Sequence, residues 1–166
     1  MPYLLDANIF IQAKNLQYGF DFCPAFWQWL LAANSANVVF SIEEIGNELK
    51  VGKDQLASWA AARDNKFFLE PNAAVVGSLT ATSTWVANSG FAAAAVNTFL
   101  GVADYQLVAR AHADGHTVVT HEVLDGSTKR IKIPLACQGL GVKWMTPYQM
   151  LSAEKAEFVL GPNSKP

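Results

Sequence analysis

The chain has 166 residues, of which 51% are hydrophobic and only 16% are charged. This composition excludes a mostly disordered protein and predicts one globular domain over residues 1–160, followed by a disordered tail at residues 161–166. The formal net charge of −2 excludes a general electrostatic attraction to nucleic acid, so any nucleic-acid binding requires a local basic patch.

Two cysteines are too few for a disulfide framework, which favours a reducing compartment. The sequence shows neither a basic and apolar leader nor a run close to the roughly 18 apolar residues of a membrane span. We therefore expect a cytoplasmic protein that does not enter a membrane.

Short apolar runs alternate with longer helical patterns along the chain. The runs predict buried strands at residues 3–5, 38–40, 67–69, 117–120 and 142–145. Helix signals fill the intervals, over residues 24–34, 41–52, 54–64, 72–88, 91–100, 103–114 and 147–160, with a short helix or turn at 134–139. This alternation predicts an α/β fold with a parallel sheet of about five strands and helices on both faces. Right-handed crossovers would place the ends of the first and fourth strands side by side.

Acidic and polar side chains follow the first predicted strand and occur in the helix predicted over residues 41–52. Asp6 follows the first predicted strand, and Asn8 comes two residues later, so on an extended chain both would face one site. Turn chemistry is the ordinary explanation of such a pair, but the apolar residues that follow do not form a polar loop. Further along, Ser41 and Glu44 have capping-box spacing, which gives Glu44 a structural role. Glu48 lies one turn later and has no such role.

Two more acids flank the fourth predicted strand. Asp104 lies at the start of the preceding helix, and Glu122 comes just after the strand. Each acid has an ordinary explanation when it is considered alone. Asp104 could cap a helix, Glu122 could be a charged loop residue, and Glu48 could lie on a solvated helix face. Ligands of parallel sheets, however, bind outside the carboxyl ends of the strands. The four acids expected to meet there are Asp6, Glu48, Asp104 and Glu122.

Several carboxylates a few ångström apart must either share a proton or bind a cation. Mg²⁺ and Mn²⁺ match such oxygen donors, and a metal-activated water at this site would hydrolyse phosphodiesters. Asn8 and Thr120 are candidates to orient the ligands or a water, with ordinary turn or core hydrogen bonding as the alternative. The basic cluster Lys129, Arg130 and Lys132 would contact substrate phosphates, with a solvated loop as the alternative.

Three stretches carry the acids: Tyr3-Leu4-Leu5-Asp6-Ala7-Asn8, Ser41 through Glu48-Leu49, and Ala103-Asp104 through Thr120-His121-Glu122. Together they resemble the PIN-domain nucleases, in their prokaryotic toxin-type branch. The similarity covers almost the whole chain and is greatest to a poorly characterised subgroup with a Lys-Ile-Pro segment, here Lys132-Ile133-Pro134. The resemblance implies a three-layer α/β/α sandwich, Mg²⁺- or Mn²⁺-dependent cleavage of RNA, an antitoxin that masks the site, and a homodimer.

The chain departs from the family pattern at two positions. Ala7 stands where family members often have Ser or Thr, which removes one hydroxyl contact. The fourth acid is commonly Asp, and the longer Glu122 stands there instead, so Asp125 could share or take over its role. The number of metal ions, one or two, therefore stays open.

We predict a metal-dependent endoribonuclease that is the toxin of a toxin–antitoxin pair. Asp6, Asp104 and Glu122 would hold the metal, and Glu48 would be a further ligand or would orient the attacking water. An inactive PIN-like binding or scaffold module is the main alternative. An Asp-based phosphatase or phosphotransferase is disfavoured, because such enzymes usually need a second Asp where this chain has Asn8.

Overall fold

A computed structural model describes residues 1–162, so residues 163–166 of the predicted tail lie outside the described part. Within residues 1–162, five parallel strands form one sheet in the order β3-β2-β1-β4-β5. The strands are β1 (Tyr3–Leu5), β2 (Val39–Ile42), β3 (Phe68–Leu69), β4 (Thr117–Val119) and β5 (Trp144–Met145). The predicted pairing of the first and fourth strands is confirmed, since Leu5 of β1 lies opposite Val119 of β4.

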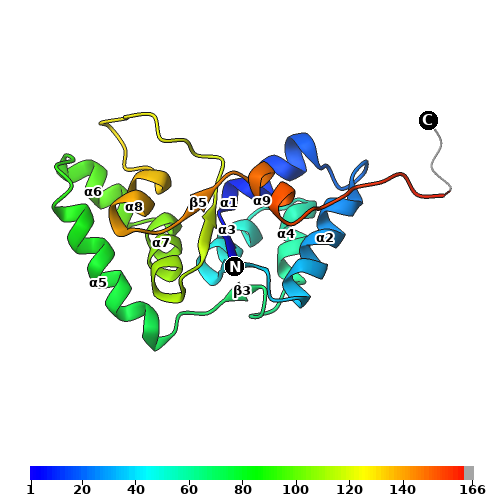
Figure 1. The fold of residues 1–166 in the computed structure, drawn as a ribbon, viewed down its shortest axis with the longest axis horizontal. Helices are drawn as coiled ribbons and strands as arrows, with labels where there is room; N and C mark the ends of the chain where they lie inside the picture. Colours follow the sequence, from blue (N-terminus) through cyan, green and yellow to red (C-terminus); the bar gives the residue numbers. More distant parts are fainter. Residues whose placement is uncertain (163–166) are drawn as a thin grey trace.

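Helices cover both sides of the sheet, as the α/β prediction requires. They are α1 (Ala7–Gln12), α2 (Pro24–Ser35), α3 (Glu43–Lys50), α4 (Gln55–Ala61), α5 (Ala73–Ala87), α6 (Ala93–Leu100), α7 (Ala103–Asp114), α8 (Ile133–Leu140) and α9 (Pro147–Ala153), with a π-helical segment, Ala13–Gln17, extending α1. In Figure 1, α5, α6, α7 and α8 lie together on one side, and α2 and α4 lie on the other.

The central strand of the sheet is fully buried. Leu4 and Leu5 of β1 are 0% exposed. Beyond the strand, Phe10 of α1 packs against Phe67 and Trp59, with ring centroids 6.1 and 5.7 Å away. This packing anchors both ends of the segment that carries Asp6, because offset aromatic contacts add to the free energy of simple burial.

Several predicted boundaries differ from the structure by a few residues, and α1 with its π-helical extension was not predicted. The differences at Asn8 and at the last helix have local reasons. Asn8 lies in the first turn of α1 instead of on an extended strand, because the chain turns into a helix directly after Asp6. The last helix ends at Ala153 instead of near Leu160. Lys155 follows it with a left-handed backbone (φ 53°), which an α-helix cannot accommodate.

The predicted capping box of α3 is also absent from the structure. Ser41 belongs to β2, and its hydroxyl donates to the carbonyl of Leu5 on the neighbouring strand at 2.7 Å. The side chain is therefore used to join two strands and does not cap the helix. A reciprocal capping box occurs instead at the start of α9, between Thr146 and Gln149.

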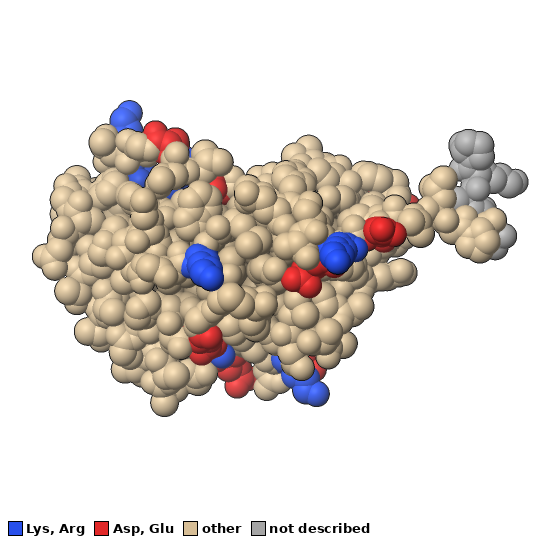
Figure 2. Space-filling view, in the orientation of Figure 1, with Lys and Arg blue, Asp and Glu red and all other residues tan. Residues whose placement is uncertain are grey.

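Charged side chains are sparse and mixed in sign on the face shown in Figure 2. One mixed group of acidic and basic side chains lies at the upper left, over the loop that follows β4 in Figure 1. Across residues 1–162, no helix has the length and apolar character needed to cross a membrane.

Candidate active site

Asp6 is the first residue after β1, at the point where the chain turns into α1. Its N–H donates to the carbonyl of Val119 at 3.0 Å, which ties it to β4. The residue is only 5% exposed, and Oδ2 accepts a hydrogen bond from the Thr120 hydroxyl at 2.8 Å. Burial raises the pKa of Asp6 to about 7, the Thr120 hydrogen bond opposes this shift, and the charges of Asp104 and Glu122 add to it.

Thr120 is fully buried and links Asp6 to the loop after β4. Its Oγ1 accepts hydrogen bonds from Asn8 Nδ2 at 3.2 Å and from the Glu122 N–H at 3.0 Å. Asn8 Oδ1 in turn accepts from the His121 N–H at 3.2 Å. The bonds made by Asp6 and Asn8 join the end of β1 and the start of α1 to the end of β4, and the Glu122 bond stiffens the loop after β4. The network therefore holds the Asp6 carboxylate in one orientation.

Asp104 enters the site from the first turn of α7. Its side chain is 20% exposed. Its pKa is raised to about 6, mainly by burial and also by the charges of Glu122 and Glu48, while Arg130 opposes the shift. The acids therefore influence one another electrostatically: Asp6 with Asp104 and Glu122, and Asp104 with Glu122 and Glu48. Asp6, Asp104 and Glu122 thus affect one another, whereas Glu48 affects Asp104 alone in this set.

Glu122 is already engaged on both carboxylate oxygens. Oε2 accepts from the backbone N–H of Ile133 at 2.7 Å, at the N-terminus of α8. Oε1 pairs with the guanidinium of Arg130, whose Nη2 is also 3.8 Å from Oδ2 of Asp104. A carboxylate at a helix N-terminus satisfies a free N–H and is stabilised by the helix dipole. Glu122 therefore has a structural role that the sequence did not reveal.

A cavity of about 580 Å³ opens beside these acids. Glu48 and Asp104 line it together with Lys129 and Arg130, so carboxylates and cations share its wall. The remaining wall comes mainly from α6 and the residues after it: Ala94, Ala95, Thr98, Phe99 and Val102. The sequence did not predict that α6 lines this cavity. The only signal was a run of alanines, residues 92–95, whose small side chains leave space beside the helix.

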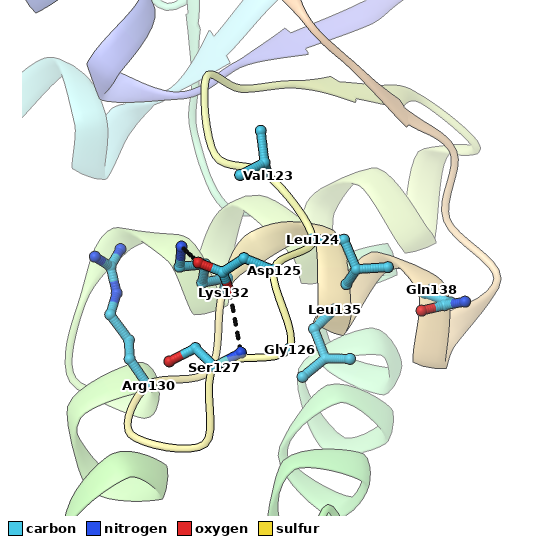
Figure 3. A pocket seen from close by; sticks show the side chains of 9 residues that line it. All are labelled: Val123, Leu124, Asp125, Gly126, Ser127, Arg130, Lys132, Leu135 and Gln138. Carbon is cyan, nitrogen blue, oxygen red and sulfur yellow. Dashed lines mark hydrogen bonds and ion pairs between the residues drawn. The ribbon is translucent and has the colours of Figure 1, made fainter.

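Asp125 and Lys132 pair with each other outside the acid cluster. They line a separate cavity of about 400 Å³ with Val123, Leu124 and Leu135 (Figure 3). Asp125 Oδ1 also accepts from the backbone N–H of Ser127 at 3.1 Å. Asp125 therefore stabilises the loop, and among the described contacts it does not join the other acids.

The donor chemistry of the cluster fits a hard divalent cation. Among residues 1–162, no three His, Cys, Asp or Glu side chains already form a metal cage. Mg²⁺, however, commonly binds through one or two carboxylates and keeps several waters, so a larger cage is not required. Burial and like charge raise the pKa of both Asp6 and Asp104, and a cation would relieve this unfavourable ionisation.

Comparison with known proteins identifies the fold. The family described as "Domain of unknown function (DUF4411)" matches residues 3–158. No curated protein matches the chain significantly. Among solved structures, VapBC2 from Rickettsia felis, crystallised bound to a DNA fragment from its promoter, is similar with a TM-score of 0.55 and 15% identity over 88% of this chain and 98% of that chain. At this identity the similarity concerns the fold alone, which is PIN-like as the resemblance implied.

Proposed function

The chain belongs to the DUF4411 family, and we propose that it is a metal-dependent endoribonuclease of the PIN type. One observation carries the proposal. Asp6 and Asp104, far apart in the sequence, are linked to Glu122 through Thr120 and Arg130 beside a cavity of about 580 Å³, and burial raises the pKa of both aspartates. A protein rarely maintains two such carboxylates together without a function for them, because ionising them in the folded state costs free energy.

Asp6 and Asp104 would hold Mg²⁺ or Mn²⁺, with Glu48 reaching from the cavity wall as a further ligand or as the group that orients the attacking water. Glu122, the third metal ligand predicted from the sequence, has both carboxylate oxygens paired in the structure, with Arg130 and with the Ile133 N–H. When bound, the cation would lower the pKa of a water and offset charge on the phosphate oxygens. Thr120 and Asn8 keep the Asp6 carboxylate in place.

The substrate proposal rests on the mixed wall of the large cavity. Lys129 and Arg130 line it together with Glu48 and Asp104, and these cations can bind the phosphates on either side of the scissile bond. Lys132 pairs with Asp125 in the neighbouring cavity and is a more distant contact. The choice of RNA over DNA comes from the resemblance to PIN-domain ribonucleases.

We also propose that the protein is the toxin of a toxin–antitoxin pair, located in the cytoplasm and able to form a homodimer. The PIN-like fold it shares with a VapBC2 structure supports this proposal. An antitoxin would act by covering the acid cluster and the cavity beside it. Co-purification of the chain with the product of a neighbouring gene would test this part.

The activity is tested by RNA cleavage with Mg²⁺, Mn²⁺ or EDTA, using the variants Asp6→Asn and Asp104→Asn. We expect both variants to lose metal-dependent cleavage while they remain folded. Asp125→Asn is the matched control, because it removes an exposed acid from the adjoining loop without touching the cluster. Full cleavage by either cluster variant would refute the assignment. Absence of both cleavage and Mn²⁺ binding in the wild-type protein would favour a scaffold module.

A further inference from the structure

Arg130 lies against the acid cluster instead of pointing only into the substrate cavity. Its guanidinium pairs with Oε1 of Glu122, and Nη2 is 3.8 Å from Oδ2 of Asp104. Arg130 therefore partly neutralises the cluster in the absence of a metal ion.

The partner that holds Arg130 is itself fixed. Glu122 is 12% exposed in its side chain, and its second oxygen is bonded to the N-terminus of α8 through Ile133. Arg130, in contrast, is 56% exposed in its side chain and comes from the irregular loop between β4 and α8. A fixed carboxylate thus holds a long and largely solvated side chain, which can leave without disturbing the packed core.

Arg130 also borders the cavities on both sides of this contact. It lines the large cavity beside Lys129 and the smaller one beside Lys132. In Figure 3 its side chain extends along the loop, apart from the Asp125–Lys132 pair. A guanidinium released from Glu122 and Asp104 therefore has open cavity space next to it, already bordered by another cation.

We propose that Arg130 is a built-in placeholder for the divalent cation, which leaves Asp104 and Glu122 when the metal binds and then contacts the substrate phosphate. This inference rests on the proposed function. Its physical basis is competition, because a divalent cation and a guanidinium repel each other and use the same carboxylate oxygens. The exchange would delay phosphate binding by Arg130 until the metal is in place.

A placeholder role and a simple phosphate-binding role for Arg130 predict different metal affinities in the absence of RNA. An arginine that only binds phosphate has no specific effect on metal affinity in the absence of RNA. A placeholder weakens metal binding in the free protein, because its ion pairs must break first. The effect should be on the order of fivefold in affinity, as expected for replacing a half-exposed ion pair.

The test is a Mn²⁺ titration of the RNA-free protein, followed by calorimetry and by the rise in melting temperature. Arg130→Gln should bind Mn²⁺ about fivefold more tightly than the wild-type protein. Lys129→Gln is the matched control, because it removes the same charge from the adjacent position of the same cavity wall. It should change the affinity by less than about twofold. Arg130→Lys, which keeps a cation that can pair with Glu122, should stay close to wild type.

Equal Mn²⁺ affinity of Arg130→Gln and wild type, or an equal gain in Lys129→Gln, would overturn the placeholder role. In either case the proposed function survives if Asp6→Asn abolishes Mn²⁺ binding. Failure of the proposed function has a different signature: the wild-type protein, Arg130→Gln and Asp6→Asn would all fail to bind Mn²⁺. The substituted side chain is largely solvent-exposed, so we expect Arg130→Gln to fold normally.

Discussion

Replacing Asp6 by Asn should stabilise the metal-free protein, even though it removes a residue that the proposed reaction needs. Asp6 is 5% exposed, and burial is the main cause that raises its pKa from 3.8 to about 7. The folded state therefore holds the Asp6 proton more tightly than the unfolded state does. Stability must fall as the pH rises from about 4 to about 7, where this proton is lost, and then level off. Asn carries no charge and avoids this loss.

The pKa shift sets the size of the effect. A rise from 3.8 to about 7 corresponds to an upper bound of about 4 kcal/mol for ionising Asp6 in the folded protein. Asn can still accept the hydrogen bond of the Thr120 hydroxyl, but its amide N–H groups need new partners in a buried place. We therefore expect a net gain of about 2 kcal/mol above pH 7, or roughly 4–8 °C in melting temperature.

Urea unfolding in EDTA at pH 4 and pH 8 measures this difference. Asp6→Asn should match the wild-type protein at pH 4 and exceed it at pH 8. Added Mn²⁺ should then stabilise the wild-type protein but not the variant, since binding to the folded state raises stability only where the ligand binds. A variant less stable than wild type at pH 8, or one that Mn²⁺ still stabilises, would refute the reasoning.

Two further predictions concern the support of the site and the packing around it. Thr120→Val removes the hydroxyl that bonds Asp6 and Asn8; it should cost about 1–3 kcal/mol in urea unfolding and weaken Mn²⁺ binding by about 10-fold or more, whereas Thr120→Ser should restore both. Gly139→Ala should destabilise the protein by about 1–3 kcal/mol, because the added Cβ would lie 2.0 Å from Cε2 of Trp85. Gly77→Ala, where a Cβ meets no atom within 4 Å, should instead gain about 0.5–1 kcal/mol in α5, and equal effects at the two glycines would contradict the packing argument.

Local patterns in the sequence were sufficient for the order of most elements, although α1 and its π-helical extension were not predicted. Apolar runs and helix signals predicted the parallel α/β sheet, and the crossover rule predicted that β1 and β4 pair. Element ends were less accurate, as the early end of α9 and the helical position of Asn8 illustrate. Helix ends depend on side-chain and backbone bonds that form only when the chain is folded.

The proximity of Asp6 and Asp104 was also predictable, because their positions relative to the strands are local. Asp6 follows a strand and Asp104 opens a helix beside the next strand in the sheet, so parallel topology brings them together. The sequence did not determine whether Glu122 or Asp125 is the fourth acid of the site. Both follow β4 in an irregular loop, and the loop path alone directs one to α8 and the other to Lys132.

The sequence by itself determined the type of sheet and the pairing of β1 with β4, and it proposed a set of carboxylates at one edge, since periodicity and chain order encode these features. Only the tertiary structure decided which side chains meet at the site. Arg130 pairs with Glu122 near Asp104, Thr120 at the end of β4 bonds Asp6 at the end of β1, and α6 lines the cavity. The physical reason is that such contacts join side chains from separate segments. Their geometry depends on how loops and helices pack, and no local pattern of residues records that packing.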